Sequence, residues 1–422
     1  MAQLPLAMLR YRLLMWLLSP ALAGYTAWVA LRHRDARYLW QRLGVVGRPA
    51  DGEHRPIWVH AASVGEVSAV APLVRRLAQR CAPRPIVLTT VTPTGAAIAR
   101  ERLGGSAIHR FLPLDWPGAV RRFVRRVRPA CLLVMETELW PNLYRACARA
   151  GVPIVLINGR LTLRSLRENR WWRGVQAQTL ARVQAVLART AADAETFMSL
   201  GMEAGRVRTL GNLKFALSGD PPAPLALGRP YVLAASTRED EERLIVEQWR
   251  KVRHGGRLLV LAPRHPARLA DILAALTPLR LQLAVRSRGQ AVTAETDVYV
   301  ADTLGELGAF MAGADLVIMG GSFVPVGGHN ILEPARLGKA VVFGPHMQNF
   351  AEEAELLRGN QAGVQLRSVA DLADCLNELL AQPEKAAALG RNAARLIAAR
   401  AGVLDDYLAA LGELCPALAP SS

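Results

Sequence analysis

The amino-acid sequence predicts an α/β protein with two doubly wound domains behind an apolar N-terminal anchor, and three observations support this. At 422 residues and 51% hydrophobic composition, the chain exceeds what one compact core usually holds. Short apolar runs without polar alternation recur between stretches of helical periodicity, which is typical of parallel sheets covered on both faces. An uncharged run near the N-terminus is about as long as a bilayer-spanning helix.

The N-terminal run is LLMWLLSPALAGYTAWVAL, Leu13–Leu31. We expect residues 1–40 to form a membrane anchor helix, either a single-pass span or a monotopic helix that docks on the surface, because Ser19-Pro20 interrupts the run. The segment RHRDAR after the run is more basic than the segment before it, so the positive-inside tendency leaves the bulk of the chain on the cytoplasmic face. The first predicted strand begins only at Ile57, so the anchor is expected to be separable from the folded domains.

The first domain is predicted to span residues 41–217 and the second residues 231–422, joined by the proline-rich linker SGDPPAPLALGRP at 218–230. The expected strands of the first domain are IWVHAA, PIVLTTV, CLLVME, VPIVLIN and VQAVLART. Those of the second are YVLAAS, RLLVLAP, LQLAVRS, VYVAD, DLVIMGG and AVVFGP. No G-x-G-x-x-G or Walker sequence follows any of them, which weighs against a dinucleotide oxidoreductase or a P-loop ATPase.

The net charge of +17 is carried almost entirely by arginine, so arginine-rich coding bias accounts for part of it. A positive surface favours nucleic acid, anionic lipid headgroups or phosphorylated substrates as partners. Aromatic residues make up only 6% of the chain, and the stacking platforms of a nucleic-acid-binding module are missing. The five cysteines lack C-x-x-C spacing, which indicates a reducing compartment and no zinc site.

Polar residues directly follow several predicted strands, at the edge where open α/β sheets bind ligands. They are Glu66 after the first strand, Glu136 and Glu138 after the third, Lys214 before the linker, and Arg264 in the second domain. Two doubly wound domains whose polar strand ends face a cleft are the architecture of GT-B glycosyltransferases. By analogy, we expect a two-substrate enzyme of that fold.

The stretch GGSFVPVGGHNILEP, which ends at Pro334, predicts a strand end, a glycine-rich turn and a helix. Backbone N–H groups at such a turn attract anions, and glycine allows a ligand close to the backbone, which favours a phosphate site. The alternative is a tight turn in which Asn330 caps the helix and Glu333 closes a capping box. His265 and His329 have no second ligand at metal spacing, so we predict a metal-free mechanism.

Seven motifs occur in order along the chain: ASVGEV, TTVTPTG, METELWPN, GNLKF, APRHP, DTLGEL and GGSFVPVGGHNILEPA. Their order and spacing resemble those of the lipid A Kdo transferases, the 3-deoxy-D-manno-octulosonic acid (Kdo) transferases of lipopolysaccharide assembly. The resemblance implies a GT-B fold and an inverting transfer of Kdo from CMP-Kdo to a lipid A precursor, lipid IVA, at the inner membrane, without a cofactor. One departure is ASTREDEE, where Arg238 and Asp240 replace the family's more frequent histidine and glycine.

By this resemblance, Glu66, Glu136 and Lys214 of the first, acceptor-binding domain take part in the transfer. A second set holds the CMP of the donor: Pro263, Arg264, Leu304, Gly305, Glu306, Asn330, Ile331, Leu332 and Glu333. Glu66 is then the general base, whereas on the residues alone a first-turn glutamate serves the helix macrodipole. We choose Glu136 over Glu138 because it follows the apolar run directly. Lys214 is one of few lysines in a chain whose positive charges are nearly all arginine, which indicates a need for a compact ammonium group at this position.

Two other functions stay open on the sequence. One is another GT-B transferase or epimerase that uses a different nucleotide sugar, which a preference for UDP over CMP would favour. The other is a membrane-tethered basic binding protein, which tight and salt-dependent nucleic-acid binding would favour. The membrane anchor and the basic charge suit the Kdo transferase interpretation, because both the phosphorylated acceptor and the inner-membrane lipids are anionic.

Overall fold

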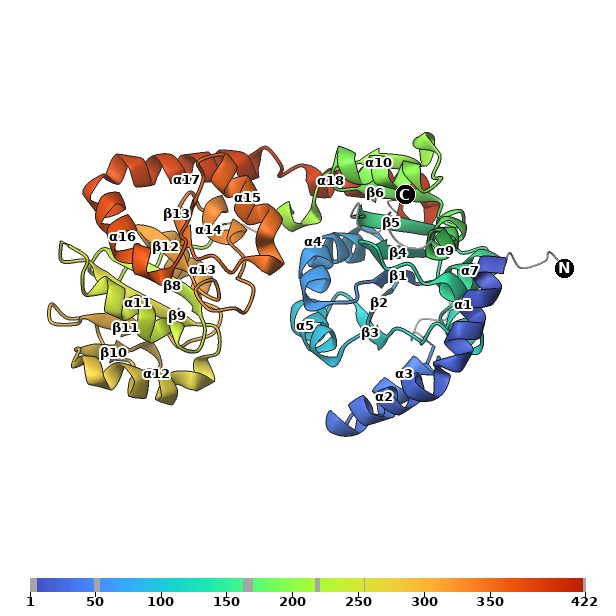
Figure 1. Cartoon of the computed structure of the whole chain (residues 1–422), viewed down its shortest axis with the longest axis horizontal. Coiled ribbons are helices and arrows are strands. Elements are labelled where there is room, and N and C mark those ends of the chain that lie inside the picture. The colour runs from blue at the N-terminus through green and yellow to red at the C-terminus, as the bar shows by residue number, and fades with distance from the viewer. Residues whose placement is uncertain (1–5, 49–53, 162–169, 217–220, 254, 420–422) are drawn as a thin grey trace. The chain divides into compact units, whose positions relative to one another are not determined.

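The computed structural model describes residues 6–48, 54–161, 170–216, 221–253 and 255–419, and the chain divides into two compact units. The first unit comprises Met1–Ala216 and Gly402–Ser422, and the second comprises Leu217–Ala401. Each unit is built on one seven-stranded sheet with helices on both sides (Figure 1). Every neighbouring strand pair in both sheets is parallel. The predicted α/β class with two parallel sheets is therefore confirmed.

The first sheet has the strand order β3-β2-β1-β4-β5-β6-β7. Its strands are β1 (Ile57–His60), β2 (Ile86–Thr90), β3 (Ile108–Phe111), β4 (Cys131–Met135), β5 (Ile154–Gly159), β6 (Ala185–Ala188) and β7 (Val207–Thr209). The helices of this unit are α1 (Leu6–Leu17), α2 (Ser19–Arg32), α3 (Ala36–Arg42), α4 (Val64–Arg80), α5 (Pro93–Leu103), α6 (Pro117–Val127), α7 (Pro141–Arg149), α9 (Arg170–Leu180), α10 (Ala191–Ser199) and α18 (Val403–Leu414). Buried side chains alternate between the two faces: Val59 packs in a cluster with α4, and Trp58 in a cluster with α6.

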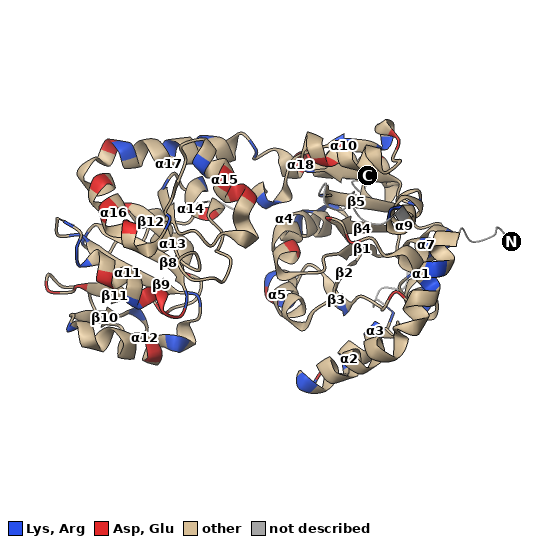
Figure 2. Cartoon of the chain, in the orientation of Figure 1, with Lys and Arg blue, Asp and Glu red and all other residues tan. Residues whose placement is uncertain are grey.

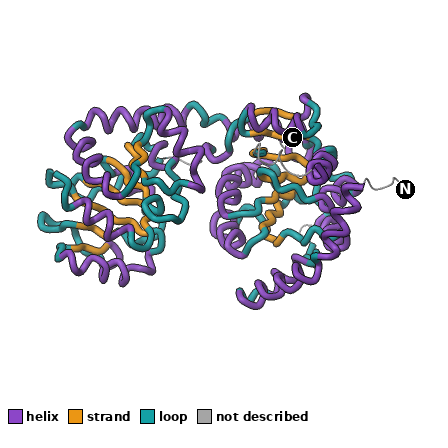
Figure 3. The backbone as a smooth tube through the Cα atoms, in the orientation of Figure 1, coloured by secondary structure: helices purple, strands orange, loops and turns teal. Residues whose placement is uncertain are grey.

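The second sheet has the order β10-β11-β9-β8-β12-β13-β14. Its strands are β8 (Tyr231–Thr237), β9 (Leu258–Pro263), β10 (Leu283–Val285), β11 (Val298–Val300), β12 (Leu316–Met319), β13 (Ala340–Phe343) and β14 (Val364–Gln365). Its helices are α11 (Glu241–Trp249), α12 (Leu269–Leu276), α13 (Leu307–Gly313), α14 (Leu332–Arg336), α15 (Ala351–Gly359), α16 (Leu372–Ala381) and α17 (Pro383–Ala398). Figure 3 shows the strands of each unit enclosed between helices.

All eleven predicted strands are present, whereas β3, β7 and β14 were missed. These three lie at sheet edges, where one side of the strand has no neighbour to bury it. The residues of β3 are mostly half-buried, and β7 and β14 are no longer than three residues. Short strands that are only half-buried leave no continuous apolar run in the sequence.

The predicted second domain at 231–422 is wrong at its end, because α18 belongs to the first unit. Leu404, Tyr407 and Leu411 pack in the same core cluster as β1 and α4. Helical periodicity reveals that α18 has an apolar face, but it cannot indicate which of two sheets that face covers. Residues 217–220, which include the start of the predicted linker, lie outside the described residues.

The anchor helix predicted at 1–40 is divided at the predicted interruption into α1 and α2, followed by the short α3. Among the described residues, no single helix is long and apolar enough to cross a membrane, and only α1 and α2 together pass that test, as a pair bent by 52°. Pro20 lies in the first turn of α2, where it lacks the N–H that would continue the α1 ladder. Figure 2 shows α2 almost without charge until its end, and its last turn contains Arg32. Several large apolar side chains of the pair are exposed, among them Trp16 (73%), Leu17 (68%) and Leu31 (77%).

Candidate active site

Glu66 lies in the first turn of α4, just beyond the carboxyl end of β1. Its carboxylate accepts hydrogen bonds from the Ala62 amide and the Ser63 hydroxyl, both at 2.9 Å, so the side chain does serve the start of the helix. Burial raises the pKa of Glu66 to about 7 against these two hydrogen bonds, and the nearby charge of Glu138 acts in the same direction as burial. A carboxylate with this pKa can both cap a helix and accept a proton near neutral pH.

The loop after β4 brings Glu138, rather than Glu136, toward this carboxylate. Glu138 Oε2 accepts a hydrogen bond from Trp140 Nε1 at 3.0 Å and lies 3.8 Å from His60 Nε2. Glu136 has a left-handed backbone with φ of 53°, and its amide donates to the Ile157 carbonyl at 2.9 Å. His60 gives no functional signal in the sequence, because a histidine inside the apolar run IWVH resembles any buried strand residue.

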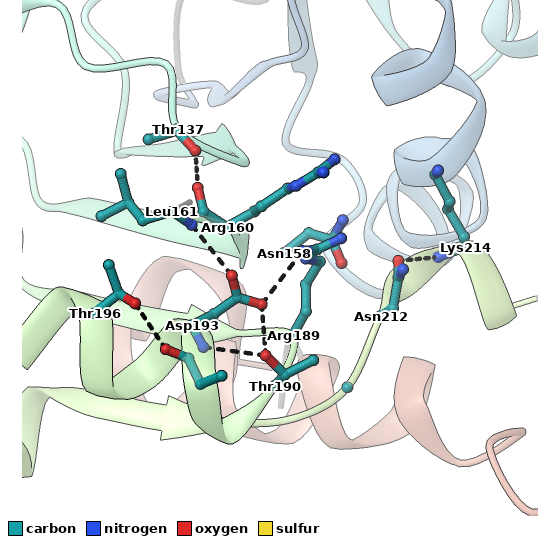
Figure 4. Close-up of polar contacts among 12 residues, drawn as sticks. Thr137, Asn158, Arg160, Leu161, Arg189, Thr190, Asp193, Thr196, Asn212 and Lys214 are labelled. Carbon is teal, nitrogen blue, oxygen red and sulfur yellow. Dashed lines mark hydrogen bonds and ion pairs between the residues drawn. The ribbon is translucent and has the colours of Figure 1, made fainter. Parts of the chain in front are cut away.

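Lys214 lies in a 3-10 turn, Leu213–Phe215, which packs against α4. Asn212 caps this turn by accepting a hydrogen bond from the Lys214 amide at 3.0 Å, as Figure 4 shows. Asn158, at the end of β5, accepts from the Leu213 amide at 2.9 Å. Tyr407 of α18 accepts from the Asn158 amide at 3.1 Å and donates to the Gly211 carbonyl at 3.1 Å. The turn that carries Lys214 is therefore held by residues far away in the sequence.

A second polar cluster fixes the loop that follows β5 (Figure 4). Buried Asp193 accepts a hydrogen bond from the Leu161 amide at 3.2 Å and forms an ion pair with Arg189 at 3.3 Å. The Thr137 hydroxyl donates to the Arg160 carbonyl and so joins this loop to the loop that carries the two glutamates. The cluster positions the backbone at the carboxyl ends of β4, β5 and β6.

In the second unit, the glycine-rich loop after β12 is organised by Glu241, which is fully buried. The Glu241 carboxylate accepts hydrogen bonds from the amides of Gly321 at 2.5 Å, Phe323 at 2.8 Å and Arg238 at 2.8 Å. Gly321 has φ of +67°, and an added Cβ would lie 2.6 Å from the His329 ring. Glycine is therefore required here by both backbone conformation and space.

The helix after this loop is shorter than the sequence predicts, since α14 covers only Leu332–Arg336. Asn330 accepts a hydrogen bond from the Leu332 amide at 3.1 Å, but the residue at the N-cap position of α14 is Ile331, which makes no side-chain cap. Glu333 accepts from the Asn330 side chain at 3.1 Å, which differs from the backbone contact of a capping box. A five-residue helix has a small dipole, so anion binding here depends on the loop amides.

Arg238 links the loops that follow β8, β9 and β12. Its Nε donates to His329 Nε2 at 3.2 Å, and its Nη1 donates to His265 Nε2 at 2.8 Å. Burial, and then the charges of Arg238 and Arg264, lower the pKa of His329 to about 4. Asp240 has φ of +69°, which explains physically why a glycine suits this position. In this cluster of Arg238, Arg264, His265 and His329, the positive charge lies on the two arginines, and the two imidazoles are neutral.

The predicted triplet after β11 is only partly available as a binding site. Leu304 is 83% exposed, and Gly305 has φ of +85°. Glu306, in contrast, is paired with Arg286 at 2.6 Å and accepts a hydrogen bond from Thr303 at 2.5 Å. The hydrogen bond from Arg286 is the main cause that lowers the pKa of Glu306 to about 2.

The structure thus gathers the predicted residues into two groups, one at the carboxyl edge of each sheet. Glu66, Glu136 and Lys214 follow strands of the first sheet. Pro263 ends β9 and Arg264 follows it, the 304–306 triplet follows β11, and residues 330–333, with Ile331 and Leu332 buried, follow β12. Within the described ranges, no group of three or more His, Cys, Asp or Glu side chains could hold a metal ion.

Comparisons with known proteins point to one family. The model of the 3-deoxy-D-manno-octulosonic-acid transferases (kdotransferases) matches residues 37–217. A 3-deoxy-D-manno-octulosonic acid transferase of Bordetella pertussis is 37% identical over 92% of this chain and 95% of its own length. One from Haemophilus influenzae is 32% identical over 89% of this chain and 91% of its own.

The solved structure of a UDP-GlcNAc 2-epimerase from Neisseria meningitidis, bound to UDP-GlcNAc, superposes with a TM-score of 0.55. The match covers 85% of this chain and 100% of the epimerase, at 12% identity. At that identity the likeness concerns the fold alone, and it supports the GT-B fold, with two parallel-sheet domains, expected from the sequence.

Proposed function

The chain belongs to the 3-deoxy-D-manno-octulosonic acid transferase family, and from this premise we propose how its two domains divide the transfer of Kdo from CMP-Kdo to a lipid A precursor. The first domain binds the acceptor and supplies the base. The second holds the CMP moiety of the donor at the carboxyl edge of its own sheet. The observation that carries the proposal is Glu66, a buried carboxylate with a pKa raised to about 7 at the carboxyl end of β1.

In the proposed reaction, an acceptor hydroxyl attacks the anomeric carbon of Kdo while the bond from that carbon to the CMP phosphate oxygen breaks. Glu66 takes the hydroxyl proton, and CMP leaves with the bonding electron pair, so the configuration inverts. Such a base must be ionised in the resting enzyme and still basic enough to take a proton, which a pKa near neutrality permits. We assign supporting roles in the transfer to Glu136 and Lys214. The charge of Glu138 helps to raise the pKa of Glu66.

In the second domain, we propose that the loop amides near Gly327 and Gly328, together with Arg264, bind the CMP phosphate. Both glycines have positive φ, and an added Cβ would lie 2.3 Å from the Asn349 side chain at Gly327 and 2.6 Å from Met347 at Gly328. The Gly328 amide donates to the Gly321 carbonyl at 2.8 Å, so we assign the phosphate to the neighbouring loop amides and to the exposed Arg264. Glu333 is left to accept hydrogen bonds from the ribose hydroxyls. No metal or cofactor is included in this mechanism.

We further propose that the enzyme acts at the cytoplasmic face of the inner membrane, with α1 and α2 as a monotopic anchor. The bend of 52° and the exposed Trp16, Leu17 and Leu31 suit helices that lie in the interface. The net charge of +17 supports attraction to anionic lipids, at about 1 kcal/mol for each basic residue near the surface.

The test is to incubate the full chain with CMP-Kdo, generated in situ, and a detergent-dispersed tetra-acylated lipid A precursor, and to weigh the lipid products by mass spectrometry. We expect a mass increment of one or more Kdo units that depends on CMP-Kdo. Protection from heat by CMP but not by UDP is expected in parallel. Absence of the increment, or a preference for UDP, would contradict the proposal.

A further inference from the structure

We infer that Tyr11 and Asp115 are positioning residues for the loop that carries Glu136 and Glu138. Helix α1 then helps to fix the geometry of the acceptor domain's site. The inference rests on the proposed function, because that function is what makes the loop important for catalysis. The chain of contacts that supports it lies entirely within the first unit.

Asp115 is the centre of the arrangement, with only 2% of its surface exposed. Its carboxylate accepts hydrogen bonds from the Tyr11 hydroxyl at 2.8 Å and from the amides of Asn142 at 3.0 Å and Leu143 at 2.7 Å. The two amides lie in the first turn of α7, where backbone N–H groups have no partner within the helix. One buried carboxylate therefore joins α1 to the start of α7.

The start of α7 is in turn joined to the glutamate loop. The helix begins at Pro141, directly after Trp140, so the position of its first turn sets where the loop ends. The Tyr144 hydroxyl, one turn further on, donates to the Glu138 carbonyl at 2.9 Å. Trp140 Nε1 donates to the Glu138 carboxylate at 3.0 Å. A shift at Asp115 would thus be transmitted to the carboxylate that lies beside His60 and influences Glu66.

The seating of α1 is specific rather than a loose hydrophobic contact. Met8 is fully buried against Val175, and Trp171 Nε1 of α9 donates to the Ala7 carbonyl at 3.2 Å. Arg12 Nε donates to the Asn142 side chain at 3.2 Å, which adds a second link to α7. In Figure 1, α1 runs beside α7 and α9, in keeping with these contacts.

These contacts overturn the expectation that the N-terminal segment is separable from the folded domains. The side of α1 that bears Tyr11 and Met8 is built into the acceptor domain, while Trp16 and Leu17 of the same helix are exposed. If Trp16 and Leu17 insert into the membrane, the membrane binds the same helix, α1, that positions the glutamate loop. Membrane attachment and the geometry of the site are then linked through the hydrogen bonds of Tyr11 to Asp115 and of Arg12 to Asn142.

The experiment compares Tyr11→Phe with Tyr231→Phe in the full chain. Both variants lose a hydroxyl from a buried tyrosine, but the Tyr231 hydroxyl donates to the Leu225 and Phe310 carbonyls in the second unit. Tyr11→Phe keeps the ring that packs in the core, so it should fold. Misplacing catalytic groups by about 1 Å can cost up to 10²-fold in rate. We expect Tyr11→Phe to lower kcat about tenfold with KM for CMP-Kdo within twofold of the parent, and Tyr231→Phe to leave both unchanged.

Hydrogen exchange gives a readout that does not depend on transfer. In Tyr11→Phe, the amides of residues 136–144 should exchange about tenfold faster, while those of β1 exchange as in the parent and in Tyr231→Phe. Arg12→Gln should give the same pattern with a smaller change. Unchanged exchange at 136–144 overturns the inference whether or not the parent transfers Kdo. Faster exchange throughout the unit also overturns it, since the effect would then be general destabilisation. A parent that shows the local exchange effect but no transfer would contradict the proposed function alone.

Discussion

The strand-end sites of the two domains use opposite electrostatics on the same sheet architecture. In the first domain, a carboxylate is buried next to another carboxylate, so its pKa rises toward neutrality. In the second, burial and then the neighbouring arginines lower the pKa values of His265 and His329, so the imidazoles stay neutral. The first environment suits proton transfer, and the second suits binding of a fixed negative charge. Electrostatics at the strand ends, more than fold, therefore separates the proposed catalytic domain from the nucleotide-binding domain.

The two sites also differ in what holds them. The loop after β12 is fixed by Glu241, which lies in the helix directly after the neighbouring strand β8. The Lys214 turn and the glutamate loop are held by Tyr407 and Asp115, across long stretches of sequence. The acceptor side thus depends on distant segments, including both ends of the chain.

The largest effect is expected for Glu66→Gln, which keeps the shape of the side chain but removes the base. A positioned general base contributes about 10²–10⁴-fold in rate. We expect turnover at saturating CMP-Kdo to fall by this factor, with the fold preserved. The control is Glu195→Gln, an exposed glutamate of α10, which should turn over like the parent. Turnover of Glu66→Gln within a few-fold of the parent would favour the purely structural role of Glu66 and leave Glu136 as the next candidate.

A smaller effect, on binding, is expected for Arg264→Gln. A hydrogen bond to a charged group contributes about 1.5–3 kcal/mol, so the Kd for CMP should rise about ten- to hundredfold. Turnover at saturation should stay within a few-fold, because the proton transfer occurs in the other domain. Arg243→Gln removes the same charge from an exposed pair with Glu247 and serves as the control. Isothermal titration with CMP distinguishes the two, and equal affinities would remove Arg264 from the donor site.

The pH dependence tests the raised pKa of Glu66 directly. The base is active only when ionised, so kcat should rise with pH through about 7 and reach a plateau above it. The Glu138 charge contributes to the raised pKa, and Glu138→Gln should therefore move this acid limb to lower pH. An acid limb that stays in place in Glu138→Gln, or that lies near the ordinary glutamate range in the parent, contradicts the assignment.

The smallest effect is expected for Asp240→Gly in the donor domain. Asp240 has φ of +69°, a conformation that costs a residue with a Cβ up to about 1–2 kcal/mol and costs glycine little. Part of this gain is offset by the entropy of the unfolded glycine, so we expect the unfolding free energy to rise by up to about 1 kcal/mol. Urea denaturation measures it, and a lower midpoint than that of the parent would show that the aspartate stabilises its own turn.

Much of the fold and the location of both sites follow from the sequence, because buried strands and their polar ends are local patterns. Local patterns could not show which of Glu136 and Glu138 lies near Glu66. An extended segment would put both side chains on one face, but the left-handed Glu136 breaks the alternation. His60 could not be identified from the sequence because its neighbour Glu138 comes from the loop after another strand, β4. The Tyr11–Asp115 contact joins residues 104 positions apart, and no periodicity reveals such a pair.

The CMP affinity of Glu66→Gln tests the division of labour between the domains most directly, measured beside Glu333→Gln under one condition. We predict that Glu66→Gln binds CMP within about twofold of the parent although its turnover is nearly lost. Glu333→Gln should bind CMP more weakly and turn over normally once the donor saturates it. Loss of CMP affinity in Glu66→Gln as large as that in Glu333→Gln would contradict the account, because one site would then serve both base and nucleotide.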